Sequence, residues 1–253
     1  MSMHPNAERG FASAAQRYQS SRPEYPHELL GWVRQRVEIG PGTDVVELGA
    51  GTGKLTQELT STGATVTAVE PLRAMAAELR QRLAGVTVVA ALAERTGLPA
   101  ASADLVVAAQ AFHWFANREA VGEIHRLLRV EGWLALIWNR RDRSHPIWAA
   151  VSDLVEPLRS NEPTHEGDRW RPVLEGSGQF GPLELARFPN LVEMSPQRLV
   201  DRVLSISFIA VLPPPDQLRL RQRLLSLWSE IIGDAVPRAE LPYLTDVFVT
   251  KRA

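Results

Sequence analysis

Residues 44–53 read DVVELGAGTG, a largely apolar run that ends in glycine at every second position, at Gly49, Gly51 and Gly53. A buried strand followed by a tight glycine turn and a helix leaves backbone N–H groups exposed at the carboxyl end of the strand. Glycine is required where the backbone turns sharply or closely approaches a ligand. The stretch therefore predicts a strand over 44–48 that leads into a ligand-binding loop.

Strand-like and helix-like segments alternate from this loop as far as Asn139. Strands are expected over 65–70, 86–90, 104–109 and 133–138, and helices over 55–62, 72–83 and from a cap at Asn117 to a stop at Gly132. Such βαβα alternation predicts a parallel sheet with right-handed crossovers and helices on both faces.

The regular alternation is lost after Asn139. Helices are expected over 147–158, 199–209 and 216–232, the last two separated by three prolines, and strands over 183–193 and 243–251. We therefore predict an N-terminal arm and helix (1–40), an α/β core (41–139), a cap and substrate region interleaved with a late strand (140–238), and a final strand of the core sheet (239–253).

Composition limits the classes of function. The 253 residues are 45% hydrophobic and 23% charged, carry a formal net charge of −1 and include no cysteine. No basic run demands a nucleic-acid partner, no apolar stretch is long enough to span a membrane, and the histidines lack metal-ligand spacing. We expect a cytoplasmic protein without a metal, and the oligomeric state stays open.

The spacing around the glycines separates three kinds of nucleotide site. A P-loop would need glycine at Leu48 and a hydroxyl at Leu55, and a dinucleotide fingerprint would need glycine at Lys54. The spacing excludes a P-loop and weakens the case for a dinucleotide-binding fingerprint. The remaining pattern, acidic-x-Gly-x-Gly-x-Gly from Glu47, resembles the first motif of class I S-adenosylmethionine (SAM)-dependent methyltransferases. The resemblance implies a Rossmann-like, seven-stranded, mostly parallel sheet with a C-terminal helical cap.

Glu70 ends the second strand, where an acidic side chain can accept hydrogen bonds from both hydroxyls of a ribose. This position also suits a nucleotide dehydrogenase, and a carboxylate there could simply stabilise the next helix. In the resembled family, the loop after the third strand flanks adenine. The cofactor residues expected from the motif and the resemblance are Tyr18, Arg22, Glu47, Gly49, Ala50, Gly51, Gly53, Glu70, Pro71, Met75, Ala93, Glu94 and Gln110.

Residues 17–26, 109–115 (AQAFHWF) and 138–142 are similar to elements of trans-aconitate methyltransferases and related proteins. The resemblance implies that Tyr18 and Arg22 contact the methionine end of SAM and that Tyr25 closes the pocket. His113 and Trp114 are the catalytic candidates, with His113 as a base or an orienting group; a lone histidine is more often structural. Arg140 and Arg141 would clamp an anionic acceptor, or lie in a solvated loop.

The sequence thus predicts methyl transfer from SAM to a small molecule, with a carboxylate or hydroxyl oxygen as the expected acceptor. Residues 110–113 replace the Asn/Asp-Pro-Pro-Tyr/Phe element of many enzymes that methylate exocyclic amines of nucleic acids, which disfavours N-methylation of adenine or glutamine. Two alternatives stay open: a SAM-fold binding module without turnover, and an NAD(P)-dependent oxidoreductase.

Overall fold

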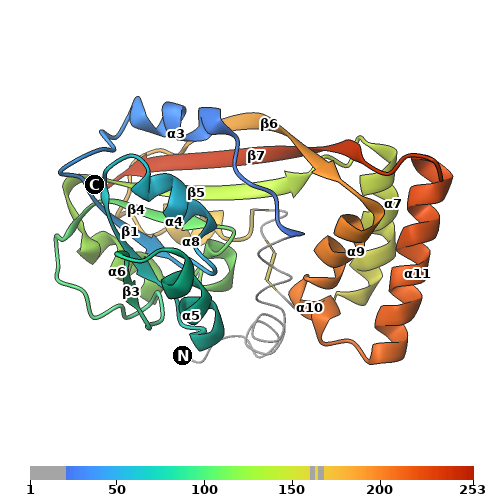
Figure 1. Ribbon diagram of the computed structural model, residues 1–253. Coiled ribbons are helices and arrows are strands. Elements are labelled where there is room, and N and C mark those ends of the chain that lie inside the picture. The colour runs from blue at the N-terminus through green and yellow to red at the C-terminus, as the bar shows by residue number, and fades with distance from the viewer. Residues whose placement is uncertain (1–20, 160–162, 165–167) are drawn as a thin grey trace. The chain divides into compact units, whose positions relative to one another are not determined.

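The computed structural model describes residues 21–159, 163–164 and 168–253 (Figure 1). The chain divides into two compact units. We call residues 25–138, 163–188 and 245–253 the core unit, and the described residues of 1–24, 139–162 and 189–244 the cap unit. No helix among the described residues combines the length and the apolar character needed to cross a membrane.

A seven-stranded sheet has the order β3-β2-β1-β4-β5-β7-β6. The ladders that join β1 to β2, β1 to β4, β2 to β3 and β4 to β5 are parallel. The strand order reverses beside β1, so the carboxyl ends of β1 and β4 form the switch point where open α/β sheets bind ligands. The strands are β1 (Asp44–Leu48), β2 (Thr65–Val69), β3 (Thr87–Val89), β4 (Ala103–Ala109), β5 (Leu128–Arg141), β6 (Glu184–Met194) and β7 (Ala239–Lys251).

Helices of the core unit cover both faces of its sheet, as predicted. Leu105 and Val107 of β4 pack in one cluster with buried residues of α3 and α4, and the intervening Val106 packs in another with residues of α6. This division follows from the alternation of side chains along a strand. The helical elements are α3 (His27–Arg34), α4 (Lys54–Thr60), α5 (Arg73–Arg82), η1 (Phe112–Trp114), α6 (Arg118–Leu127) and α8 (Arg171–Glu175).

The helices of the cap unit enclose a hydrophobic core of their own, which includes Trp148, Leu199, Leu224 and Tyr243. They are α7 (Pro146–Val155), η2 (Glu156–Leu158), α9 (Pro196–Leu204), α10 (Ser207–Ala210) and α11 (Pro214–Ile231). The single helix predicted over 199–209 is wrong, because α9 ends at Leu204 and α10 is a separate short helix.

Two boundaries correct the sequence analysis. The side chain of Asn117 caps α6 by accepting a hydrogen bond from the N–H of Ala120 at 2.8 Å, as predicted. However, α6 ends at Leu127, and β5 begins at Leu128 instead of at Trp133. Gly132 lies inside β5, where a Cβ atom would come within 2.9 Å of a backbone oxygen. This glycine therefore serves close packing in a strand, and the sequence signal for a helix stop was misleading.

Candidate active site

The glycine loop joins β1 to α4 and is held against the end of β2. The N–H groups of Gly49 and Ala50 donate to the carbonyl oxygen of Val69, at 2.8 and 3.2 Å. Gly49, Gly51 and Gly53 have φ angles of +69°, +59° and +85°, a region that side chains disfavour. The local fold of the loop therefore requires all three glycines.

The glycines differ in what surrounds them. A Cβ atom on Gly49 would lie 2.6 Å from the Cβ of Ala111, so protein atoms already fill the space beside it. A Cβ on Gly51 would meet only the sulfur of Met75, at an ordinary contact distance of 3.8 Å. Close packing thus explains why residue 49 is glycine. At position 51, the remaining reasons for glycine are the positive φ and the approach of a ligand.

Glu70 fastens this loop to the residues after β2. One carboxylate oxygen accepts the N–H of Gly51 at 2.8 Å, and the other accepts the N–H of Leu72, also at 2.8 Å. Burial raises the pKa of Glu70, while the hydrogen bonds from Leu72 and Gly51 oppose the shift. Each carboxylate oxygen has a further lone pair. Glu70 is therefore positioned to accept additional donors at the loop.

Glu47 is the second buried carboxyl group of the site. Its Oε2 accepts the hydroxyl hydrogen of Thr56, the first-turn residue of α4, at 2.5 Å. Burial raises the pKa of Glu47 to about 8; the hydrogen bond from Thr56 lowers it, and the nearby charge of Glu70 raises it further. Glu47 consequently carries a proton at neutral pH. Its role here is to join β1 to α4 beneath the loop.

The residues predicted near adenine lie on two further elements. Met75, in α5, and Ala93, after β3, are both buried. Glu94 accepts a hydrogen bond from the side chain of Asn117 at 2.9 Å, and Asn117 also caps α6. Glu94 is thereby tied to the start of α6, which positions its carboxylate whether or not it contacts adenine.

In the segment after β4, Gln110 and His113 both form hydrogen bonds with residues of β5. Gln110 has a φ of +58°, rare for a residue other than glycine, and its N–H donates to the carbonyl oxygen of Ile137 at 2.8 Å. Such backbone strain is concentrated at functional sites. The Nδ1 atom of His113 accepts a hydrogen bond from the indole N–H of Trp138 at 3.2 Å. The predicted pair His113 and Trp114 thus lies in η1, with ring centroids 5.3 Å apart.

In the cap unit, two asparagines hold the segment that follows Arg22. The side-chain amides of Asn139 and Asn190 both donate to the carbonyl oxygen of Glu24, at 3.1 and 2.9 Å. The sequence analysis assigned no role to Asn139 and missed Asn190 altogether. An isolated asparagine in a strand carries no signal for a contact more than 100 residues distant.

None of the loop contacts described above includes the remaining predicted residues. Arg140 and Arg141 end β5 and are partly buried members of the cap unit, whereas Tyr25 begins the core unit. Tyr18 lies outside the described residues. The predicted roles of these residues and of Arg22 stay predictions.

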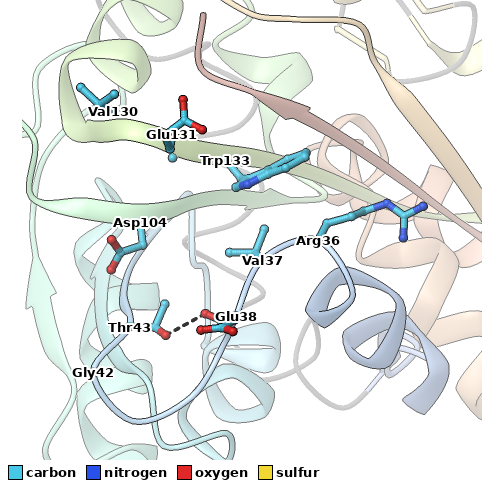
Figure 2. Close-up of a pocket in the computed structure, with 10 residues that line it drawn as sticks. Arg36, Val37, Glu38, Gly42, Thr43, Asp104, Val130, Glu131 and Trp133 are labelled. Carbon is cyan, nitrogen blue, oxygen red and sulfur yellow. Dashed lines mark hydrogen bonds between the residues drawn. The ribbon is translucent and has the colours of Figure 1, made fainter.

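A surface pocket of the core unit lies at the opposite end of the strands (Figure 2). Its lining includes Thr43, just before β1, Asp104, at the start of β4, and Val130 to Trp133 of β5. Ligands of open α/β sheets bind at the carboxyl ends of the strands, so this pocket is not the predicted site.

Comparisons with known proteins agree with the loop geometry. Residues 46–136 match the family model described as a methyltransferase domain. An uncharacterized methyltransferase-like protein of Schizosaccharomyces pombe is 34% identical over 224 residues, which cover 88% of this chain and 85% of the relative. Its name specifies no acceptor, so the narrower resemblance to trans-aconitate methyltransferases stays a prediction.

Solved structures share the fold. A protein of Anaeromyxobacter dehalogenans, described as a type II methyltransferase, is 24% identical to this chain and has a TM-score of 0.65. The match covers 91% of this chain and 97% of that protein. A phosphoethanolamine N-methyltransferase of Haemonchus contortus, in complex with S-adenosylhomocysteine, is 15% identical, with a TM-score of 0.61 over 100% of this chain and 60% of its own. With the sequence relative, the sheet order and the glycine loop, these findings show that the chain belongs to the class I SAM-dependent methyltransferases.

Proposed function

We propose that this methyltransferase transfers the methyl group of SAM to an oxygen atom of a small molecule, either a carboxylate or a hydroxyl. The observation that carries the proposal is the contact between Gly51 and Glu70, which brings a buried carboxylate to the glycine loop. The segment after β4, where many enzymes that methylate exocyclic amines of nucleic acids have an Asn/Asp-Pro-Pro-Tyr/Phe element, contributes Gln110 and His113 instead.

The residues present fit the cofactor. A ribose presents two neighbouring hydroxyl donors, and Glu70 offers a carboxylate whose described partners are backbone N–H groups, with no cation among the described residues to compete for it. The open side of Gly51 permits a ligand to approach the backbone, which a side chain there would obstruct. The Haemonchus contortus enzyme of the same fold binds the demethylated form of this cofactor. We assign the ribose to Glu70 and the adenine to the neighbourhood of Met75, Ala93 and Glu94.

SAM supplies a methyl group on a positively charged sulfur, which is already a good leaving group. The protein mainly has to align the acceptor and exclude water. His113 and Trp114 are proposed to contact the acceptor, because η1 follows β4 at the switch point and Gln110 introduces it in a strained conformation.

Calorimetric titration of the purified protein with SAM and, separately, with NADH tests the cofactor site. We expect micromolar affinity for SAM and no heat of binding with NADH. A screen of acceptors with methyl-labelled SAM follows, beginning with small carboxylic acids and continuing with hydroxyl compounds. Methylation of amines alone would contradict the proposed acceptor class, and absence of SAM binding would contradict the site itself.

A further inference from the structure

The cap unit contains a buried arginine that lacks an anionic partner. Arg202 lies in α9 and is 8% exposed, and it is the one buried arginine in the part of the chain that the structure describes. Its Nε and Nη1 atoms are buried and have no hydrogen-bond partner among the described residues. No ion pair of those residues includes Arg202 either.

Other arginines of the cap unit are paired although water reaches them. Arg223, with 48% of its side chain exposed, binds Glu230 at 2.6 Å. Arg238, with 68% of its side chain exposed, binds Glu193 at 2.6 Å. Water already stabilises these exposed charges, so their ion pairs add little. The arginine that most needs an anion, Arg202, is therefore one that lacks it.

The charge of Arg202 requires an explanation, because arginine stays protonated in proteins. An unpaired ion in a protein interior is strongly unfavourable, and each unsatisfied N–H adds to the effect. An apolar side chain of similar length would avoid both penalties. Leu199 and Val203 of the same helix do pack in the hydrophobic core of the cap unit. A bound anion explains an arginine at this position, whereas packing does not.

Buried hydroxyl groups lie at the end of α9 that carries Arg202. The hydroxyl of Ser205 donates to the carbonyl oxygen of Arg202 at 2.8 Å, and the hydroxyl of Ser21 donates to that of Ser205 at 3.4 Å. Ser205 is 0% exposed and Ser21 is 1% exposed. These hydrogen bonds fix the backbone at Arg202 and contribute no negative charge. Ser21, Arg202 and Ser205, all in the cap unit, thus form a buried polar patch with a positive charge.

We propose that Arg202 is the centre of a phosphate-binding site within the cap unit. A guanidinium binds oxyanions bidentately, and burial strengthens the interaction because water screens it less. Nε and Nη1 both lack a partner, and their N–H groups point in different directions. A carboxylate offers two oxygens in one plane, whereas a phosphate group offers three or more in a tetrahedral arrangement. Phosphate therefore satisfies more of the donors of Arg202, whatever the identity of the methyl acceptor.

A free phosphate ion and a phosphorylated small molecule present the same group to Arg202. The affinities of inorganic phosphate and of phenyl phosphate distinguish the two sources. Similar affinities indicate a site for the free ion. An affinity at least about tenfold higher for phenyl phosphate indicates a small molecule whose apolar part also contacts the cap unit.

Titration calorimetry and thermal unfolding of the full-length protein test the site without SAM or an acceptor. At constant ionic strength, we expect inorganic phosphate to bind with a Kd at or below about 1 mM and, at ten times this concentration, to raise the Tm by about 3–5 °C. Arg202→Met should abolish both effects. Arg202→Lys keeps the charge without the planar fork and should bind about tenfold more weakly. Arg223→Met, the matched control, removes the same charge from an exposed ion pair and should respond to phosphate as the wild type does.

The stability of Arg202→Met without phosphate separates a binding role from a structural one. Because this variant removes an unpaired buried charge, its Tm in phosphate-free buffer should equal or exceed that of the wild type. A Tm several degrees lower would show that Arg202 already serves the fold, and would overturn the proposal. Absence of binding by both inorganic phosphate and phenyl phosphate would overturn it as well, as would equal binding by the wild type and Arg202→Met.

Discussion

The carboxyl groups at the two ends of the parallel sheet in the core unit have different kinds of partner. At the amino end, Asp44 and Asp104 both bind the guanidinium of Arg129, at 2.7 and 2.6 Å. At the carboxyl end, Glu47 and Glu70 are almost fully buried and, among the described residues, neither has a cationic partner. A hydroxyl and two backbone N–H groups satisfy them instead.

The two ends differ in how their charged groups affect stability. Ion pairs with side chains more than a third exposed contribute little to stability, because water screens them. Buried carboxyl groups without a cation are unfavourable to folding, and their pKa values rise as a result. Such groups persist where function needs acceptors for hydroxyl or amine donors. The comparison therefore supports the proposed site at the carboxyl end, independently of the glycine motif.

The largest expected effect comes from a side chain placed at the carboxyl end. Gly51→Val puts a β-branched residue at a φ of +59° and fills the open side of the loop. We expect SAM affinity to fall by about 100-fold or more, because the new side chain occupies the space through which the cofactor would approach the loop. The backbone strain, about 1–3 kcal/mol, lowers the folding stability. Titration calorimetry measures the affinity, and circular dichroism checks that the variant is folded.

Gly42→Val is the matched control at the other end. Gly42 has a φ of +91° and, like Gly51, has no close neighbour that a Cβ would strike. Comparable destabilisation with unchanged SAM affinity is expected. If Gly42→Val weakens SAM binding as much as Gly51→Val does, the two ends of the sheet are not functionally distinct.

The buried carboxyl of Glu47 predicts a dependence of stability on pH. Its pKa is about 8 in the folded protein and 4.5 as an ordinary carboxyl, so the folded state binds the extra proton between these values. The associated stabilisation is complete below the lower value and is lost as pH rises through about 8. We expect the unfolding free energy to fall by on the order of 4 kcal/mol between pH 5 and pH 8.5.

Urea unfolding of the wild type and of Glu47→Gln at these two pH values measures the effect. The variant retains an acceptor for Thr56 but has no proton to lose, so its stability should change much less with pH. An equal decline in both proteins would assign the pH dependence to other groups.

Glu70→Gln tests the acceptor that faces the loop. An amide group provides one acceptor oxygen in place of two, and its NH2 would face the N–H of Gly51 or Leu72. We expect SAM affinity to fall by about tenfold, the loss of one charge-assisted hydrogen bond. Asp104→Asn is the matched control: it removes a carboxylate at the amino end and should leave the titration curve unchanged.

The smallest effect is expected at the amino end itself. Arg129→Gln breaks both ion pairs of Asp44 and Asp104. Because all three side chains are more than a third exposed, the unfolding free energy should fall by less than about 1 kcal/mol. The difference from wild type should shrink further in 1 M salt. A loss of several kcal/mol would show that this network is a structural centre of the fold.

Local sequence signals predicted most elements of the core unit within a few residues. The strand over 44–48 was predicted with its observed bounds, and Asn117 was identified as a helix cap, because burial periodicity and capping chemistry are written into neighbouring residues. The early start of β5 and the short helix α8 were missed. Gly132 matches the sequence pattern of a helix stop although it lies inside β5. Pro172 lies in α8, which is too short to show a hydrophobic periodicity.

The sequence alone predicted the class of the protein, since the spacing of Glu47, Gly49, Gly51 and Gly53 excludes a P-loop and resembles the first motif of class I methyltransferases. The order of the predicted strands and helices also matched the parallel part of the observed sheet. Only the tertiary structure decided how individual groups behave. Gly51, which donates to Glu70, is 19 residues away from it, and Trp138, which donates to His113, is 25 residues away. Protonation depends on burial and on donors that approach through space, and neither of these is encoded in the identity of the adjacent residues.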